Sequence, residues 1–218
     1  MSIATLILGE SGTGKSTSMR NLDPEHTLLI QSVKKPLPFK SKGWTYITKD
    51  NPKGNIFVTD SSVQIVQIMQ KTRRSVVVID DFQYILANEF MRRSEEKGFD
   101  KFTDIGRHAW DILNATSALA DNVRVYVLGH TQSDDYGRVK VKTIGKLLDE
   151  KIVIEGMFSI VLRTAVQDRN YLFSTRNNGS DTVKSPIGLF DDDLIENDLA
   201  IVDAAIFNYY GPQDRAAA

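Results

Sequence analysis

Cysteine is absent from the 218 residues, and only three histidines occur. Without cysteine the chain can form no disulfide framework, thiolate zinc site or iron–sulfur cluster, and it has no cysteine nucleophile. The three histidines, His26, His108 and His130, are too few to favour an all-histidine metal site. No apolar run approaches the roughly 20 residues that a membrane-spanning helix requires, and no signal-type segment opens the chain. We therefore expect a cytoplasmic protein that does not contact a membrane.

A strong charge of one sign is also missing, because 27 basic and 28 acidic residues leave a net charge of −1. The charges are unevenly placed. Residues 1–180 carry 25 basic and 20 acidic side chains, whereas residues 181–218 carry 2 and 8. This balance excludes a globally basic nucleic-acid-binding protein but permits a local basic surface. The length suffices for one domain with a sizeable core.

Apolar runs of strand length alternate with amphipathic stretches of helix length, which predicts an α/β fold of three layers with a mostly parallel sheet. Buried strands are expected over 3–8, 27–30, 75–80 and 123–129, and an edge strand over 44–48. Helices are expected over 15–22, 61–69 and 83–120, the last with a break at Gly98. A proline- and lysine-rich loop is expected over 33–42. The single domain, 1–218, would then be extended by late antiparallel strands. This extension over 131–180 includes a hairpin over 133–142 and strands over 157–166 and 170–176, and a C-terminal helix covers 190–210.

The first loop matches the phosphate-binding pattern G-x-x-x-x-G-K-[ST] between a predicted strand and a predicted helix. It reads Gly9, Glu10, Ser11, Gly12, Thr13, Gly14, Lys15 and Ser16, with Thr17 next. Glycines let successive N–H groups point at an anion, and a helix N-terminus adds a positive dipole. Lys15 would contact the β- and γ-phosphates of ATP, and Ser16 a Mg²⁺ ion. The alternative is a glycine-rich turn that binds nothing.

Two carboxylates follow the clearest apolar run, Val76 to Ile79. Asp80 would hold a magnesium-bound water beside Ser16. Asp81 could orient or deprotonate an attacking water, and is the predicted catalytic carboxylate. The alternatives are a strand-end cap for Asp80 and a helix N-cap for Asp81.

The strand expected over 123–129 ends in the polar residues His130, Thr131 and Gln132. ATPases with an extra strand between the two motif strands place a polar residue there, where it can sense the γ-phosphate. His130 and Gln132 are therefore candidate catalytic residues beside Lys15 and Asp81. A structural hydrogen-bonding role is the alternative for each.

Three cations alternate with two valines in the expected hairpin. On a strand, Arg138, Lys140 and Lys142 share one face. Tyr136 stands at the turn beside them, so phosphate-neutralising charge meets a stacking surface, as in proteins that bind single-stranded DNA. The alternative is the polar face of an exposed hairpin.

Together, these elements resemble the RecA-like/AAA group of P-loop ATPases. They are most similar to small phage-encoded nucleotide-binding proteins that accompany recombination and single-strand annealing. The similarity spans about 3–210 and includes the stretches 79–84, 129–132, 142–146, 149–151, 175–179 and 184–186. The resemblance implies a homo-oligomer, a ring or filament in the host cytoplasm. It also implies Mg²⁺-dependent ATP hydrolysis coupled to single-stranded DNA binding, in phage recombination or replication.

One departure from this group affects the chemistry. RecA-type ATPases usually carry a catalytic glutamate after the strand that follows the phosphate loop, whereas this strand ends Ile30-Gln31-Ser32. Either Asp81 takes that task or hydrolysis is slow; Glu10 is a weaker substitute. A nucleotide-gated scaffold with negligible hydrolysis therefore remains an alternative. A small-molecule or nucleotide kinase is a further alternative, although its arginine-rich lid has no counterpart among the scattered arginines of this chain.

The resemblance further implies a basic finger that reaches the γ-phosphate from a neighbouring subunit. Lys142, Lys146, Arg163 and Arg176 follow the last predicted strand of the core and are its candidates. The sequence does not rank them.

Overall fold

The computed structural model describes residues 1–145, 148 and 151–211. Its main sheet has the strand order β10-β9-β8-β1-β5-β4-β2-β3. The segment from β8 to β3 is parallel throughout, and β9 and β10 join one edge in antiparallel pairing. The strands are β1 (Ile3–Leu8), β2 (Thr27–Gln31), β3 (Ile56–Val58), β4 (Val76–Asp80), β5 (Arg124–Gly129), β8 (Ile160–Gln167), β9 (Asn170–Ser174) and β10 (Leu194–Glu196). The predicted α/β class with a mostly parallel sheet is confirmed.

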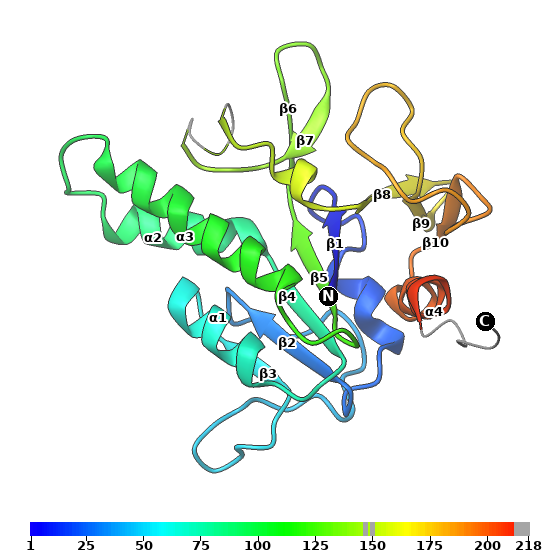
Figure 1. The fold of residues 1–218 in the computed structure, drawn as a ribbon, viewed down its shortest axis with the longest axis horizontal. Coiled ribbons are helices and arrows are strands. Elements are labelled where there is room, and N and C mark those ends of the chain that lie inside the picture. Colours follow the sequence, from blue (N-terminus) through cyan, green and yellow to red (C-terminus); the bar gives the residue numbers. More distant parts are fainter. Residues whose placement is uncertain (146–147, 149–150, 212–218) are drawn as a thin grey trace, which may run out of the picture.

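Helices cover both faces of this sheet (Figure 1). One face carries α1 (Ser62–Lys71), α2 (Phe82–Arg92) and α3 (Asp100–Ser117). The other carries the 3₁₀ helix η1 (Ser16–Asn21) and α4 (Leu199–Tyr210), and a second 3₁₀ helix, η3 (Ile154–Met157), precedes β8. Strands covered on both sides need apolar residues at every position, which explains the continuous apolar runs in the sequence.

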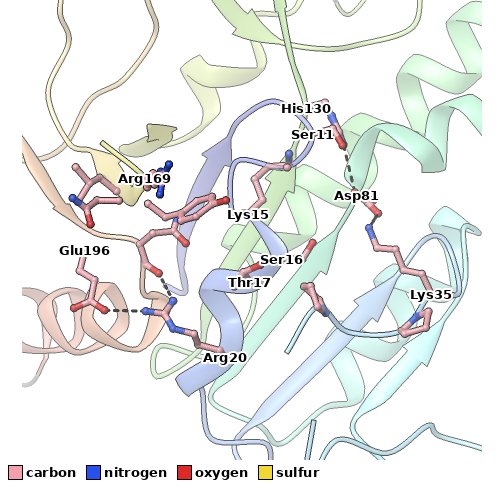
Figure 2. A pocket seen from close by; sticks show the side chains of 18 residues that line it. Ser11, Lys15, Ser16, Thr17, Arg20, Lys35, Asp81, His130, Arg169 and Glu196 are labelled. Atoms are coloured by element: carbon pink, nitrogen blue, oxygen red, sulfur yellow. Dashed lines mark hydrogen bonds and ion pairs between the residues drawn. The ribbon is translucent and has the colours of Figure 1, made fainter. Parts of the chain in front are cut away.

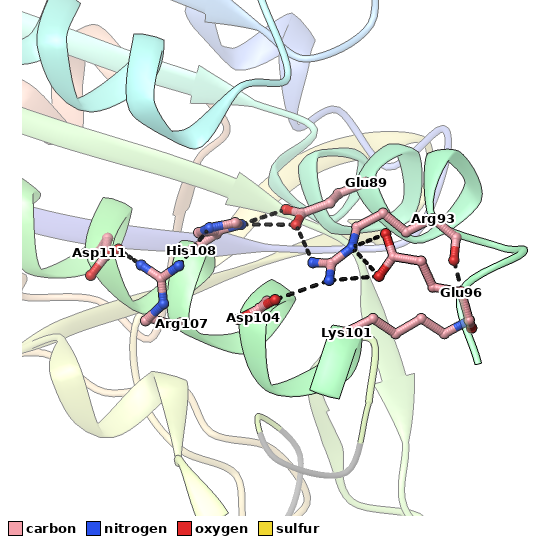
Figure 3. A network of polar contacts seen from close by, with 8 residues as sticks. All are labelled: Glu89, Arg93, Glu96, Lys101, Asp104, Arg107, His108 and Asp111. Atoms are coloured by element: carbon pink, nitrogen blue, oxygen red, sulfur yellow. Dashed lines mark hydrogen bonds and ion pairs between the residues drawn. The ribbon is translucent and has the colours of Figure 1, made fainter. Parts of the chain in front are cut away.

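A charged network joins α2 to α3 on either side of the predicted break (Figure 3). Helix α2 ends at Arg92 and α3 begins at Asp100, and Gly98 in the connection between them has a φ of +93°. The Arg93 guanidinium then contacts Glu89 at 3.2 Å and Asp104 at 2.9 Å, while His108 Nδ1 lies 2.8 Å from Glu89. The network links the charged side chains of α2 and α3 across their contact.

The structure differs from the predicted elements at the periphery of the sheet. The segment 44–48 forms only a bridge between Tyr46 and Ile56, and β3 takes the edge instead. The reason is local, because Asn55 accepts a hydrogen bond from the Thr45 amide and Thr45 accepts one from the Asn55 amide. The strand predicted over 157–166 is β8, but it pairs in parallel with β1.

The C-terminal helix is shorter than predicted. It begins at Leu199, because Asp198 is its N-cap and accepts a hydrogen bond from the Ala200 amide at 2.8 Å. Residues 194–196 pair with β9 as a strand. A cap thus overrides the apolar periodicity that suggested an earlier start.

The helix after the glycine loop is also shorter than predicted and is a 3₁₀ helix. The Ser18 hydroxyl donates to the Lys15 carbonyl at 2.6 Å and so competes with α-helical hydrogen bonding in the first turn. A six-residue 3₁₀ helix adds less dipole than the predicted α-helix. An anion at this loop would therefore be held mainly by the loop amides and Lys15.

Parallel pairing brings the carboxyl ends of the central strands to one edge of the sheet. Leu8 is in register with Gly129, and Gln31 with Asp80. The segments that follow these residues therefore meet at this edge, where ligands of open α/β sheets bind.

Among the residues described, no helix combines the length and apolar character needed to cross a membrane.

Candidate functional site

A cavity of about 830 Å³ opens at the carboxyl edge of the sheet, between the glycine loop and two segments distant in sequence (Figure 2). The glycine loop and η1 form its floor, the loop after β2 forms one wall, and the turn between β8 and β9 with the end of β10 forms the other. The lining residues are Ser11, Gly12, Gly14, Lys15, Ser16, Thr17, Arg20, Lys35, Pro36, Pro38, Asp81, His130, Arg169, Asn170, Tyr171, Leu172, Glu196 and Asn197.

Lys15 is held inside the glycine loop. Its Nζ donates to the carbonyl oxygens of Gly9 at 2.8 Å and Glu10 at 2.7 Å, and the residue is only 6% exposed. Burial lowers the pKa of its ammonium to about 8, against the opposing pull of the carboxylates of Asp81 and Asp80. Phosphate oxygens can replace these two neutral carbonyl acceptors with charged ones.

Ser16 and Asp80 meet across the edge of the sheet. The Ser16 hydroxyl lies 2.9 Å and 3.0 Å from the two carboxylate oxygens of Asp80, which is 1% exposed at the end of β4. Burial, and then the neighbouring charge of Asp81, raise the pKa of Asp80 to about 6.

A hydroxyl next to a carboxylate offers the hard oxygen ligands that Mg²⁺ prefers. In the part of the chain that the structure describes, no group of three or more His, Cys, Asp or Glu could hold a metal. Ser16 and Asp80 would supply two oxygen ligands to a Mg²⁺ ion, and water and phosphate would supply the others, the usual arrangement for this metal.

Two glycines allow the loop to take its path. Gly14 has a φ of +96° and lies under Tyr171 and Asn197, whose nearest atoms would be 3.1 Å and 3.0 Å from an added Cβ. An added Cβ at Gly9 would lie 1.9 Å from Thr164 Oγ1 on β8. Strand β8 thus packs directly against the loop.

We expect Gly9→Ala to destabilise the fold by roughly 1–3 kcal/mol, because overpacking forces the loop or β8 to move. Urea unfolding followed by circular dichroism measures the effect. Gly156→Ala is the matched control, because its new Cβ would meet nothing closer than 3.9 Å. Equal stability of the Gly9 and Gly156 variants would contradict the close approach of β8.

Asp81 is the N-cap residue of α2 but makes no side-chain capping hydrogen bond. Its φ of 60° is left-handed, a conformation that costs about 1 kcal/mol and turns its carboxylate away from the helix. The carboxylate instead contacts the Lys35 ammonium and lies 3.6 Å from His130 Nε2 (Figure 2). The Ser32 hydroxyl lies 2.8 Å from the Asp81 carbonyl. Asp81 is therefore held at the cavity.

His130 also reaches the cavity, whereas Gln132 does not line it. The His130 amide donates to Gln83 Oε1 at 3.2 Å, and its ring meets Tyr84 edge-on at 6.4 Å between centroids. Burial and the nearby Lys15 lower the pKa of His130, which favours the neutral imidazole. Gln132 and Thr131 lie on β6 (Thr131–Ser133), directed into the following hairpin.

Several lining residues were missed by the sequence reasoning. Arg20 lies four residues after Ser16 and contacts Glu196 at 2.9 Å, and helical spacing could have suggested it. Lys35 stands in the lysine-rich loop, where nothing singled it out. Arg169 and Tyr171 reach the cavity only because β8 pairs with β1.

The predicted DNA-binding residues lie on a separate hairpin of β6 and β7 (Val139–Val141), away from the sheet (top of Figure 1). Tyr136 is 95% exposed at its turn, and Arg138 is also exposed. Lys140 pairs with Gln132 across the hairpin. The amide of exposed Lys142 donates to the His130 carbonyl at 2.7 Å, so the base of the hairpin adjoins the cavity.

Two finger candidates are engaged within the chain. Arg163 Nη2 lies 3.4 Å from buried Asp181, and Arg176 Nη1 lies 2.7 Å from Asp193. Lys142 is exposed, and Lys146 lies outside the described residues, as do Asp149 and Glu150 of the resemblance.

No protein-family model matches the chain, and no curated protein sequence matches it significantly.

Proposed function

We propose that the chain is a RecA-like P-loop ATPase that binds ATP with Mg²⁺ and hydrolyses it. The contact between Ser16 and Asp80 carries this proposal, because it joins the glycine loop to a buried carboxylate beside Lys15. A bound Mg²⁺ would neutralise phosphate charge there. The nine loop residues from Gly9 to Thr17 would hold the phosphates through their amides and Lys15.

Hydrolysis is supported by the position of Asp81 and His130 on the wall of the same cavity. Asp81 would orient a water whose oxygen attacks the γ-phosphorus as the bond to the bridging oxygen breaks. The water's proton passes to Asp81 or to a phosphate oxygen, and ADP and inorganic phosphate leave. His130, as a neutral imidazole, would sense the terminal phosphate.

We propose that hydrolysis is coupled to single-stranded DNA binding in phage recombination or replication, by a homo-oligomer in the host cytoplasm. The hairpin supports the coupling, because it begins directly after His130 and ends in exposed charge and an exposed aromatic ring. Phosphate release by the purified protein, with and without single-stranded DNA at low salt, tests both halves. If the protein does not hydrolyse ATP, the proposed ATPase activity is wrong. If single-stranded DNA does not change the rate of hydrolysis, the proposed coupling is wrong.

We expect Tyr136→Ala to weaken single-stranded DNA binding roughly 5- to 100-fold, which is the loss of one stacked base. Fluorescence anisotropy with a labelled oligonucleotide measures it. Phe99→Ala is the matched control, because Phe99 is 86% exposed at the start of α3, apart from the hairpin. If both variants bind like the wild type, the hairpin is only a polar surface.

A nucleotide-gated scaffold with negligible hydrolysis is the second candidate. It is favoured by the end of β2, where Gln31 donates to the Lys35 carbonyl at 3.3 Å and no carboxylate faces the cavity. Phosphoryl transfer to any member of a nucleoside panel would instead favour a kinase.

A further inference from the structure

Lys35 is the only cation that the loop between β2 and β3 contributes to the lining of the cavity. Pro36 restricts the backbone of Lys35 to extended conformations. Leu37 and Phe39, both partly buried, pack against the hydrophobic core on one face of the sheet, and the Phe39 ring meets the Trp44 ring edge-on at 6.2 Å between centroids. The backbone is therefore fixed, while the four-carbon side chain, 39% exposed, retains freedom to move.

The Lys35 ammonium bridges the two motif carboxylates. It contacts Asp81 directly and lies 3.9 Å from Asp80 Oδ2. Although partial burial opposes the charged form, the hydrogen bond to Asp81 raises the pKa of Lys35. Lys35 thus neutralises the carboxylate that we assign to the attacking water.

A nucleoside triphosphate changes this balance, because its terminal phosphate brings several negative charges close to Asp81. Those oxygens are stronger acceptors than one carboxylate, and they repel Asp81. Lys15, which hydrogen-bonds the carbonyls of Gly9 and Glu10, is already assigned to the phosphates from within the glycine loop. Lys35 is the second ammonium that lines the cavity.

We propose that Lys35 is a mobile phosphate-contacting residue that exchanges Asp81 for the terminal phosphate when ATP binds. The exchange rests on the proposed nucleotide site. It releases Asp81 to orient water only when a third phosphate is present. Lys35 thereby discriminates ATP from ADP, and it supplies from within the chain a charge that a neighbouring subunit would otherwise provide.

Calorimetric titration of the full chain with ADP and with a nonhydrolysable imido analogue of ATP tests the exchange. We expect Lys35→Met to weaken binding of the analogue roughly 10- to 100-fold, because one charge-assisted contact to the terminal phosphate is lost. Binding of ADP should weaken less than about twofold. Lys35→Arg should restore most of the discrimination. Lys34→Met is the matched control, because Lys34 lies over the Tyr46 ring at 5.2 Å and does not line the cavity.

Each other outcome is distinct. Equal losses of affinity for both nucleotides would show that Lys35 only stabilises the loop. No loss of affinity would show that Lys35 keeps its contact with Asp81. Tighter analogue binding by Lys35→Met at limiting Mg²⁺ would show that the ammonium merely occupies the place of the metal. All three overturn the exchange, whereas a wild-type protein that binds neither nucleotide overturns the proposed function itself.

Discussion

Replacing Lys15 with alanine is expected to weaken ATP binding by roughly 100-fold or more, the largest loss of nucleotide affinity that we anticipate for a single side chain. Two charge-assisted contacts to phosphate, each of about 1.5 kcal/mol, account for this factor. The unfolding temperature of the nucleotide-free protein should change little. The variant loses the hydrogen bonds to Gly9 and Glu10, but it also avoids burying an ammonium.

Equilibrium titration with a fluorescent ATP analogue measures the affinity, and thermal unfolding without nucleotide checks the fold. Lys15→Arg should weaken ATP binding almost as much, because a planar guanidinium cannot replace an ammonium packed between two carbonyls. Lys34→Ala serves as the control for loss of one positive charge. Unchanged binding by Lys15→Ala would leave the glycine loop as a turn without a ligand.

Asp81→Asn is expected to lower the turnover of ATP by roughly 100- to 10,000-fold while ATP binding persists, as for loss of a general base. Asparagine tolerates the left-handed backbone that Asp81 adopts, so the loop should keep its shape. Burial and then the charge of Asp81 raise the pKa of Asp80, so removing the Asp81 charge relieves the second of these causes. Stability should therefore be maintained although activity is lost.

Phosphate release and nucleotide titration, measured on the same preparation, separate the candidates. A scaffold would show the same negligible turnover before and after the substitution. Asp121→Asn is the matched control, because Asp121 is exposed and precedes β5 at the opposite edge of the sheet. If Asp81→Asn turns over ATP at the wild-type rate, another group activates the water.

The arrangement also suggests how nucleotide and hairpin would communicate. Asp81 lies 3.6 Å from His130, and the His130 carbonyl accepts a hydrogen bond from the amide of Lys142 at the far base of the hairpin. A change of partner at Asp81 is thus two contacts from β7. The DNA dependence of ATP turnover in Lys35→Met would measure this coupling, since the exchange begins at Asp81.

Local patterns were sufficient for the central strands and for the glycine loop. Buried parallel strands appear as unbroken apolar runs, as over Ile3–Leu8 and Val76–Asp80, because both faces need apolar side chains. The residues of the glycine loop are contiguous in sequence, so one motif contains them. The two carboxylates were found because the end of a parallel strand faces the same edge as that loop.

The walls of the cavity depend on long-range pairing that no local pattern encodes. Arg169, Tyr171 and Asn197 face the loop because β8 pairs with β1 in parallel and then turns back through β9 and β10. Lys35 reaches Asp81 because β2 and β4 are neighbours in the sheet. The exclusion of Gln132 follows from the hairpin, which pairs β6 with β7 and leaves only His130 at the site. The order of strands in a sheet depends on how the whole chain buries its apolar side chains. These contacts can therefore be recognised only in the tertiary structure.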